Sequence, residues 1–362
     1  MMKQLRYKNI INALLVLTTC VVFGQNKVSK EIKKTATLPN NGQLYIENKY
    51  GDVFIDGWNK QTIEITVEIE AKGRNLDKAK ELLKRINPEI ETSGNVVMVK
   101  SHISERELGF FNKYIKKVDA FNAEKTNTNI NYKINMPKQA EIEVFNKYGD
   151  VVITNWNGTL KADIEHGDLR ITDAIDNANI TLKYGQLKTN NLNTALVNSK
   201  QATVTISNVN KLKLNSNGSE IYINSVNTLE LYSDKDTIEI QELNTIFGTV
   251  KYTTASFNKL KSKANLELHL AELRVLKCAD NPVIVLNQNT SEVYINIAQT
   301  NFHFNAKLEQ GVLRIPKTMT NITSKVLDEK NKIRHVKANY KNAQQGTIDI
   351  AGYKGIVILK EL

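Results

Sequence analysis

A short internal repeat constrains the fold of this chain more than any other feature of its sequence. Apolar residues fall at offsets 0, 2, 5, 8 and 10 from Val204, and the same offsets recur from Ile221 and again from Ile238. Self-similarity at a fixed period is typical of stacked repeat architectures. The three repeats contain Val204, Ile206, Val209, Leu212 and Leu214, then Ile221, Ile223, Val226, Leu229 and Leu231, then Ile238, Ile240, Leu243 and Ile246.

The spacing within one repeat predicts two short strands joined at a corner. Offsets 0 and 2 lie on the same face of one strand, offsets 8 and 10 lie on the same face of a second, and offset 5 lies at the corner between them. Two short strands cannot bury their own apolar face, so successive repeats, here called coils, must stack at a spacing of about 4.8 Å. The sequence therefore predicts an all-β fold, a parallel β-solenoid of 17–18-residue coils with a small helix-containing N-terminal section.

The same offsets continue in both directions from the central repeats. Earlier coils contain Ile134, Met136, Ile142 and Val144, then Val151, Ile153, Trp156, Leu160 and Ala162, then Leu169, Ile171, Ala174, Ala178 and Ile180, then Leu187, Thr189, Leu192, Ala195 and Val197. Later coils contain Ala255, Phe257, Leu260, Ala264 and Leu266, then Leu273, Val275, Cys278 and Val283, then Val293, Ile295, Ala298, Phe302 and Phe304, and a last contiguous coil with Leu313, Ile315 and Ile322. After a charged stretch at 328–334, the offsets return at Ile348, Ile350, Tyr353, Ile356 and Ile358, which predicts a closing strand pair that caps the end of the stack.

Four asparagines share one position in successive coils. They are Asn193, Asn210, Asn227 and Asn244, and the interval between them equals the period of the repeat. Stacking places their amides one strand spacing apart, so we predict a ladder in which each amide bonds to the next. An asparagine at a corner also adopts the left-handed conformation at low cost. A row of ligand-binding amides is the alternative interpretation.

The N-terminal part of the chain follows a different pattern. Alternating strands are predicted between Leu44 and Gly73, and residues 76–86 have helical spacing, with Asn75 or Asp77 as the N-cap and Pro88 after the end. We expect this helix to cover the first end of the stack or one sheet face, and residues 101–128 to form a polar loop. The predicted divisions are a signal peptide at 1–24, the N-terminal section at 25–132, the solenoid at 133–325 and a C-terminal loop with capping strands at 326–362.

The first residues predict export from the cell. Lys3, Arg6 and Lys8 precede an apolar run over residues 10–23, and Gln25 becomes the new N-terminus after cleavage, as in a secretory signal peptide. Lipidation at Cys20 stays open as an alternative. Removal of 1–24 takes away three positive and no negative charges, so the formal net charge falls from +11 to +8. One cysteine then remains, and it cannot form an internal disulfide.

Two copies of the hexapeptide NKYGDV carry a family resemblance. They occupy residues 48–53 and 146–151, and each is followed by an isoleucine and a tryptophan, Ile55 and Trp58 or Ile153 and Trp156. With the signal peptide, the amphipathic helix and the later Gly-Asp turns, this order resembles the putative-adhesin family of secreted β-solenoid proteins from bacterial envelopes. The resemblance covers residues 40–260 well and the last hundred weakly. It implies a fold and a location, and it brings no catalytic residues.

The sequence offers no cluster that is typical of catalysis or of a cofactor. The histidines His102, His166, His269, His303 and His335 lack metal-ligand spacing, and no phosphate-binding glycine loop or nucleophile elbow is present. Cys278 is expected to be a buried small hydrophobe, because a nucleophilic thiol needs a basic partner. We therefore predict no catalytic, cofactor or metal site.

The turn aspartates Asp52, Asp150 and Asp168 share one coil position. We expect them to cap turns, since calcium solenoids carry a denser Gly-Gly-x-Gly-x-Asp pattern, although calcium binding stays open. The outward row of the first strand is mixed and lacks the clustered carboxylates of a glycan-degrading site. This row consists of Val152, Arg170, Lys188, Thr205, Tyr222 and Glu239. A separate set of tyrosines is expected on the surface, namely Tyr148, Tyr184, Tyr222, Tyr232 and Tyr252.

Together these features predict a monomeric, exported binding protein of the bacterial cell envelope that acts by surface contact and is not an enzyme. Its expected location is the periplasm, the outer-membrane surface or the extracellular space, and its expected partner is an envelope glycan, polymer or protein rather than nucleic acid. A structural or signalling envelope protein is the alternative, and a polysaccharide-degrading β-helix enzyme is a further one.

Overall fold

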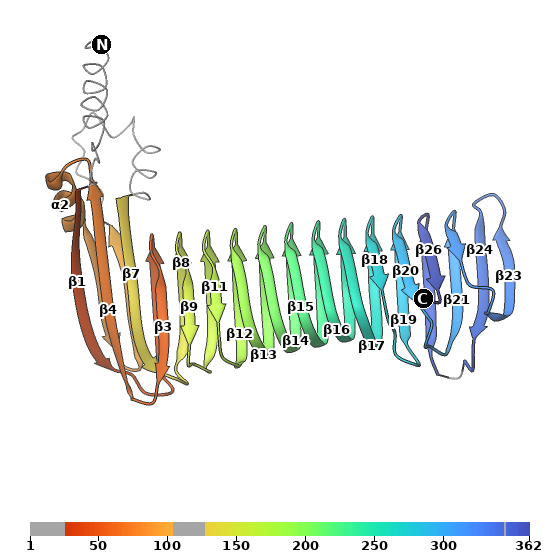
Figure 1. Cartoon of the computed structure of the whole chain (residues 1–362), viewed down its shortest axis with the longest axis horizontal. Helices are drawn as coiled ribbons and strands as arrows, with labels where there is room; N and C mark the ends of the chain where they lie inside the picture. The colour runs from red at the N-terminus through yellow and green to blue at the C-terminus, as the bar shows by residue number, and fades with distance from the viewer. Residues whose placement is uncertain (1–25, 104–126, 344) are drawn as a thin grey trace, which may run out of the picture. The chain divides into compact units, whose positions relative to one another are not determined.

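The computed structural model describes residues 26–103, 127–343 and 345–362, which form one α-helix and a 26-stranded, mostly parallel sheet (Figure 1). The described chain is therefore nearly all β. The predicted signal peptide, Cys20 and most of the predicted polar loop lie outside the described residues. Within these ranges, no helix has the length and apolar character that a membrane crossing requires.

The chain divides into two compact units. Among the described residues, unit 1 comprises 26–30, 69–86, 103 and 127–129, and unit 2 comprises 31–68, 87–102, 130–343 and 345–362. Unit 1 contains α2 (Leu76–Arg85), which begins after Asn75, and the side chain of Asn75 accepts a hydrogen bond of 2.9 Å from the Lys78 backbone amide. This confirms Asn75 as the predicted N-cap. Boundaries between the two units fall within strands β1 (Asn26–Thr37) and β4 (Thr62–Gly73) and at the start of β5 (Ile86–Ser93).

The central coils of unit 2 pair in parallel at the predicted register. Val204 lies opposite Ile221, which lies opposite Ile238, and the inward residues at the other offsets align in the same way (Figure 1). The corner at offset 5 does not interrupt the strands as predicted, because pairing continues through it. The long strands are β13 (Gln186–Lys200), β14 (Thr203–Asn217), β15 (Glu220–Asp234), β16 (Thr237–Lys251) and β17 (Thr254–His269).

The longer coils before them also align as predicted along their strands, but Ala174, predicted to point inward, is exposed, and Ile175 is buried in its place opposite Leu192. Leu169 lies between Val151 and Leu187, and Ala178 lies between Leu160 and Ala195. These coils are built from β8 (Glu141–Lys147), β9 (Val151–Thr154), β10 (Thr159–Glu165), β11 (Leu169–Ile171) and β12 (Ile175–Lys183). The inward residues form the core, and Trp156 is among the largest fully buried side chains.

The first NKYGDV segment lies directly beside the second. Strand β2 (Gln43–Lys49) pairs with β8 and with β6 (Val96–Ile103), and β3 (Val53–Trp58) pairs with β9 and with β7 (Thr128–Pro137). Asn48 is therefore opposite Asn146, and Val53 is opposite Val151. The coil nearest the N-terminus is inserted between two coils formed later in the chain.

The C-terminal strands are also inserted into the stack, which corrects the prediction that Ile348–Ile358 caps its end. Strand β25 (Thr347–Tyr353) pairs in parallel with β19 (Val283–Asn289) and β21 (Phe302–Glu309). Strand β26 (Ile356–Lys360) pairs with β20 (Glu292–Asn296) and β22 (Val312–Arg314). The physical reason is that Ile348, Ile350 and Val357 are all buried, so this coil is stable between two neighbours.

The end of the sheet is instead formed by an antiparallel pair. Strand β24 (Ile333–Tyr340) pairs with β21, and β23 (Thr320–Asp328) pairs with β24. Ile322, predicted to point inward in a last coil, lies in β23 and is 49% exposed.

A second correction concerns β18 (Glu272–Val275) and the segment after it. Val283 is predicted to point inward, but it pairs with Lys263, whose side chain points outward. Ile284 and Leu286 point inward instead, because the connection after Cys278 is longer than in the other coils.

Candidate functional site

One corner of twelve successive coils in the described part of unit 2 contains a residue in the left-handed conformation. Non-glycine residues occupy this position in most coils, and φ is 60° at both Tyr148 and Lys235. In the first coils the residue after this position is a glycine. A Cβ added to Gly167 would meet the carbonyl oxygen of Gly149 at 1.9 Å, so the backbones of adjacent coils approach too closely here for any side chain. The left-handed column contains Tyr50, Tyr148, His166, Tyr184, Gln201, Gly218, Lys235, Tyr252, Leu270, Thr290, Gln310 and Lys354.

Four rings of this column stack on one another. Tyr148 and His166 have ring centroids 5.1 Å apart, and His166 and Tyr184 have centroids 4.7 Å apart, with interplanar angles of 6° and 11°. Tyr50 stacks on Tyr148 at 5.5 Å. The sequence predicts His166 to be an ordinary solvent-exposed turn residue, and it is exposed, but it is also the third ring of this stack. Tyr148 and Tyr184 are therefore not scattered surface tyrosines.

The turn aspartates cap the stack from coil to coil. The backbone amide of Asp150 donates to Asp52 Oδ1, that of Asp168 donates to Asp150 Oδ1, and that of Gln186 donates to Asp168 Oδ1, each at 2.8 Å. This confirms the predicted capping role. Among the described residues, no group of three His, Cys, Asp or Glu side chains is placed to hold a metal ion.

The predicted asparagine ladder is confirmed. Asn210 Nδ2 donates to Asn193 Oδ1, Asn227 Nδ2 to Asn210 Oδ1 and Asn244 Nδ2 to Asn227 Oδ1, each at 2.9 Å. None of these four residues has a positive φ, so they do not use the left-handed conformation that is open to a corner asparagine. A second row runs beside the ladder, where Asn208 donates to Asn191 at 2.9 Å, and a groove of about 550 Å³ lies along the two rows.

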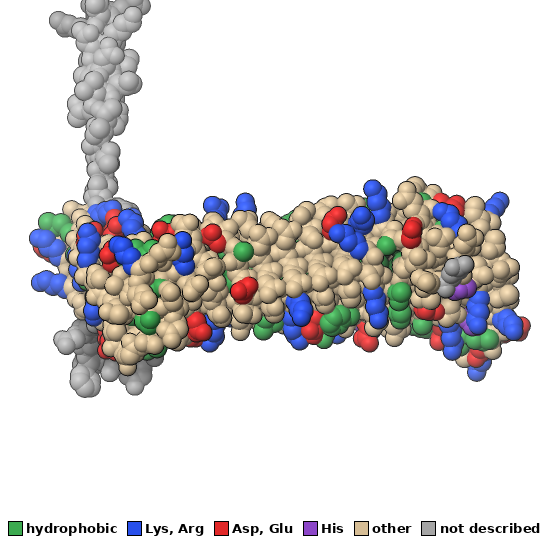
Figure 2. All heavy atoms as spheres, turned by 90° about the horizontal axis from the view of Figure 1, so that it is seen from below, with side chains coloured by type: hydrophobic (Ala, Val, Ile, Leu, Met, Phe, Trp, Pro, Cys, Tyr) green, Lys and Arg blue, Asp and Glu red, His purple; other side chains and the backbone are tan. Residues whose placement is uncertain are grey.

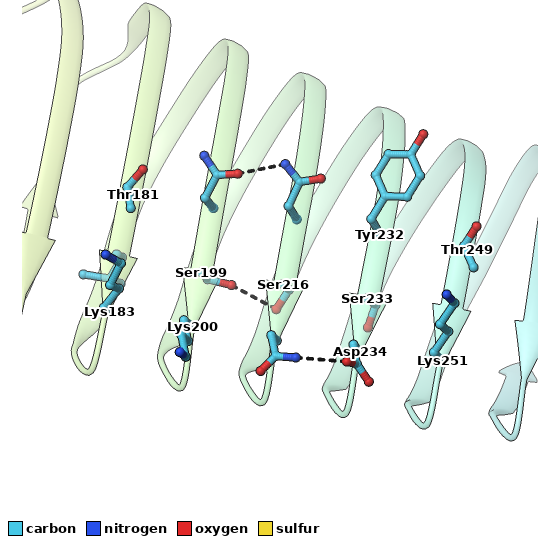
Figure 3. A pocket seen from close by; sticks show the side chains of 14 residues that line it. Thr181, Lys183, Ser199, Lys200, Ser216, Tyr232, Ser233, Asp234, Thr249 and Lys251 are labelled. Atoms are coloured by element: carbon cyan, nitrogen blue, oxygen red, sulfur yellow. Dashed lines mark hydrogen bonds between the residues drawn. The ribbon is translucent and has the colours of Figure 1, made fainter.

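A second groove, here called groove 1, runs along the stack over β12–β16 and has a volume of about 500 Å³ (Figure 3). Its two walls are outward rows separated by one inward position of each coil. One wall consists of Thr181, Asn198, Asn215, Tyr232 and Thr249, and the other consists of Lys183, Lys200, Asn217, Asp234 and Lys251.

Hydrogen bonds along the stack fix both walls of groove 1. Asn215 Nδ2 donates to Asn198 Oδ1 at 2.8 Å, and Asn217 Nδ2 donates to Asp234 Oδ2 at 3.0 Å (Figure 3). Tyr232 is 44% exposed, and the Lys213 ammonium lies 5.3 Å from its ring centroid. The side-chain amides of the two walls are therefore held in place before any ligand binds.

Positive charge exceeds negative charge in groove 1. Lys183, Lys200 and Lys251 line it, and Asp234 is its one acidic residue. In the described part of the chain, neither Lys200 nor Lys251 forms an ion pair. Nearby lysines differ, since Lys213 pairs with Glu230 at 2.7 Å. Ammonium groups without a protein partner remain available to an anionic ligand.

Buried hydroxyl groups lie beneath groove 1. Ser199 Oγ donates to Ser216 Oγ at 2.9 Å, and Ser233 Oγ donates to Asp236 Oδ2 at 2.6 Å. Asp236 also accepts a 2.7 Å hydrogen bond from the Ser219 backbone amide. Burial raises the pKa of the Asp236 carboxyl, and these hydrogen bonds act in the opposite direction. Because Asp236 is only 4% exposed, its role is structural.

Cys278 and the histidines do not form a reactive site. Burial raises the pKa of the Cys278 thiol to about 12, so the thiol is protonated at neutral pH. Its side chain is half-buried, less than the burial that the sequence predicts. His303 Nδ1 lies 2.9 Å from Asn339 Oδ1, and His335 Nε2 lies 2.5 Å from Asn305 Oδ1. His102 is exposed in β6, and His269 ends β17.

The predicted outward row of the first strand aligns as expected. Val152 lies opposite Arg170, and the row continues through Lys188, Thr205, Tyr222 and Glu239. Figure 2 shows basic and acidic side chains interspersed over the face that it views.

Groove 1 was missed at the sequence level. Its lysines are one or more whole coils apart, and no local charge cluster marks them. The coil period could have revealed the groove. Applied to the outward positions of the second strand, it aligns Lys183, Lys200 and Lys251 in one row.

No family model and no curated protein sequence matches this chain. Similar solved structures include "a putative adhesin" from Parabacteroides merdae, with 10% identity, a TM-score of 0.39 and coverage of 73% of this chain and 96% of that one. They also include "a putative cell adhesion protein" from Clostridium sporogenes, with 8% identity, a TM-score of 0.19 and coverage of 92% and 100%. A third is a "putative lipid binding protein" from Parabacteroides distasonis, with 12% identity, a TM-score of 0.26 and coverage of 73% and 97%. At these identities and TM-scores, the similarities carry no argument about function.

Proposed function

We propose that this chain is an exported β-solenoid of the bacterial cell envelope that binds an extended polymer or protein by surface contact, without catalysis. One observation carries the proposal. Polar side chains recur in straight outward rows at the spacing of one coil, and two of these rows border groove 1. A repetitive, rigid surface of this kind suits a ligand that is itself long and repetitive.

The test of this function is binding of the purified protein, residues 25–362, to an array of glycans and to envelope fractions, at low and at raised salt. Saturable binding that survives raised salt is expected, because hydrogen bonds and shape are screened less than exposed charges. Binding to every anionic ligand alike that disappears with salt contradicts the proposal, since the net charge of +8 alone explains it. A complete lack of binding would favour the structural or signalling role instead.

Export is a separate part of the proposal. The mature protein is expected to begin at Gln25, after cleavage behind Gly24. Mass spectrometry of the protein purified from a bacterial periplasm or medium measures this end directly. The variant Leu15→Asp interrupts the apolar run, so it should keep the chain uncleaved in the cytoplasm, whereas Asn12→Ser should be processed as before. Cleavage of both variants, or of neither, would contradict the signal-peptide assignment.

A further inference from the structure

We propose that groove 1 binds a linear anionic polysaccharide whose carboxylate or sulfate groups lie on Lys183, Lys200 and Lys251. This inference rests on the proposed function and names the ligand class. It follows from three features of the groove, which are its direction, its charge and the chemistry of its walls.

The direction of groove 1 favours a linear polymer. The groove crosses five coils and runs along the stack, perpendicular to the strands (Figure 3). At about 4.8 Å per coil its walls extend for about 20 Å. One coil advances by nearly the same distance as one sugar residue in an extended chain. A polysaccharide can therefore keep register with successive side chains, whereas a compact small molecule would contact only a fraction of the groove.

The charge of groove 1 favours an anionic ligand. Lys183 and Lys200 lie in adjacent coils, and Lys251 lies three coils beyond Lys200, about 14 Å away by strand spacing. Lys200 and Lys251 have no ion-pair partner among the described residues. Charge-assisted hydrogen bonds from such ammonium groups to carboxylate or sulfate oxygens are stronger than neutral ones.

The groups between the lysines favour a sugar over other polyanions. Asn217 and Asp234 occupy the two coils that separate Lys200 from Lys251, and Asp234 would repel a uniformly charged chain such as polyphosphate. Asn217 can donate hydrogen bonds to hydroxyl groups and accept them, and the Asp234 carboxylate can accept them. The exposed ring of Tyr232, in the facing wall, offers an apolar surface to the C–H face of a pyranose. A glycan with charged and uncharged residues matches this sequence of groups.

The experiment compares a hyaluronan hexasaccharide, in which every second residue carries a carboxylate, with a neutral hexasaccharide and with polyphosphate, by titration calorimetry with residues 25–362. The hyaluronan hexasaccharide is expected to bind, and the other two are expected to bind at least about tenfold more weakly. The double variant Lys200→Gln/Lys251→Gln should weaken binding of the hyaluronan hexasaccharide by about tenfold or more. Lys188→Gln/Lys211→Gln removes the same charge from exposed positions outside the groove, so it should change the affinity by less than about twofold.

A second variant separates recognition of the sugar from recognition of charge. Tyr232→Ala keeps the net charge and should weaken binding of the hyaluronan hexasaccharide. Circular dichroism should show unchanged folding for all three variants. Equal losses in the two lysine variants would overturn the inference, as would tighter binding of polyphosphate or of the neutral hexasaccharide. If envelope fractions still bind while the groove variants have no effect, the proposed function stands and this assignment of groove 1 is wrong.

Discussion

The left-handed corner is the most constrained position of each coil at the scale of single residues. An L-amino acid in this conformation costs about 1–2 kcal/mol relative to the right-handed regions. The chain nonetheless places tyrosine, histidine, glutamine, lysine, leucine and threonine there. Coil-to-coil hydrogen bonds hold the conformation, and the Lys235 backbone amide donates to the Lys251 carbonyl at 3.0 Å. Stacking of rings at Tyr148, His166 and Tyr184 offsets part of the cost.

The substitution Lys235→Gly should stabilise the protein by up to about 1 kcal/mol. Glycine removes the left-handed penalty, while the entropy that it adds to the unfolded chain costs about 0.5–1 kcal/mol. The exposed Lys235 side chain has no ion pair in the described structure. Urea unfolding measures the difference. As a control, Thr237→Gly in β16 has no left-handed penalty to remove and should destabilise by about 0.5–1 kcal/mol. Destabilisation by both variants would show that the corner is not strained.

The buried carboxyl of Asp236 should make stability fall as pH rises. Burial raises the pKa of Asp236 above 3.8 in the folded state, so the folded protein holds this proton more tightly than the unfolded chain. The contribution is therefore favourable below the raised pKa and is lost as pH rises through it. In Asp236→Asn the titration is absent. The free energy of unfolding of the variant, relative to the wild type, should rise as pH rises above about 4, the ordinary pKa of an aspartate.

Thermal unfolding across this pH range provides the measurement for Asp236. The exposed Asp176→Asn serves as the control for loss of one negative charge. A difference between Asp236→Asn and the wild type that does not change with pH would mean that hydrogen bonds from Ser233 and the Ser219 amide cancel the effect of burial.

At the scale of elements, the inward residues of β14–β16 carry the stability of the central coils. Ile223 is 2% exposed and lies between Ile206 and Ile240. The substitution Ile223→Asp places an unpaired charge between two coils, so it should destabilise by more than about 4 kcal/mol. The neighbouring Asn224→Asp faces outward and should change stability by less than about 0.5 kcal/mol. Similar melting temperatures of the two variants would contradict the register of this strand.

The central coils could be predicted from sequence because their contacts are one period apart. The same offsets fix which residues point inward and which residues are opposite each other, and Asn210 and Asn227 follow the same rule. The insertion of β2–β3 and β25–β26 could not be predicted in this way, because it depends on partners several periods distant in the chain that share the same inward pattern. The repeated NKYGDV segment was the one visible sign of such pairing.

Strand β23 ends the sheet with features that discourage pairing to another chain. Its pairing with β24 is irregular between Thr320 and Thr323 and again between Val326 and Asp328. Lys325 lies in the middle of this edge. Bulges and a central lysine are the devices by which natural edge strands avoid aggregation. The exposed Ile322 and Val326 are therefore compatible with the expected monomer.

At the scale of the whole molecule, stability depends on contacts between neighbouring coils. Deletion of residues 345–362 removes β25 and β26, so β19–β20 and β21–β22 lose the coil that joins them. In a nearest-neighbour stack this loss remains local. We expect limited proteolysis of the deletion variant to remove residues after about 283 while residues 133–275 stay protected.

A synthetic peptide of residues 345–362, added in trans, should restore protection because its strands have partners on both sides. Removal of Leu362 alone is the control, since this residue is 83% exposed and should leave the digest unchanged. Unfolding of the entire deletion variant would instead indicate that the stack is a single cooperative unit.

The positions of the two inserted coils also determine where such a chain can change its length. A tandem duplication at either terminus would lack a free place in the sheet, since β2–β3 and β25–β26 are already enclosed by strands from elsewhere in the chain. A duplication of one whole period within 186–251 would add one coil with every pairing preserved. Evolutionary growth of this protein is therefore expected in its middle, and each gene duplication there would lengthen groove 1 by one step.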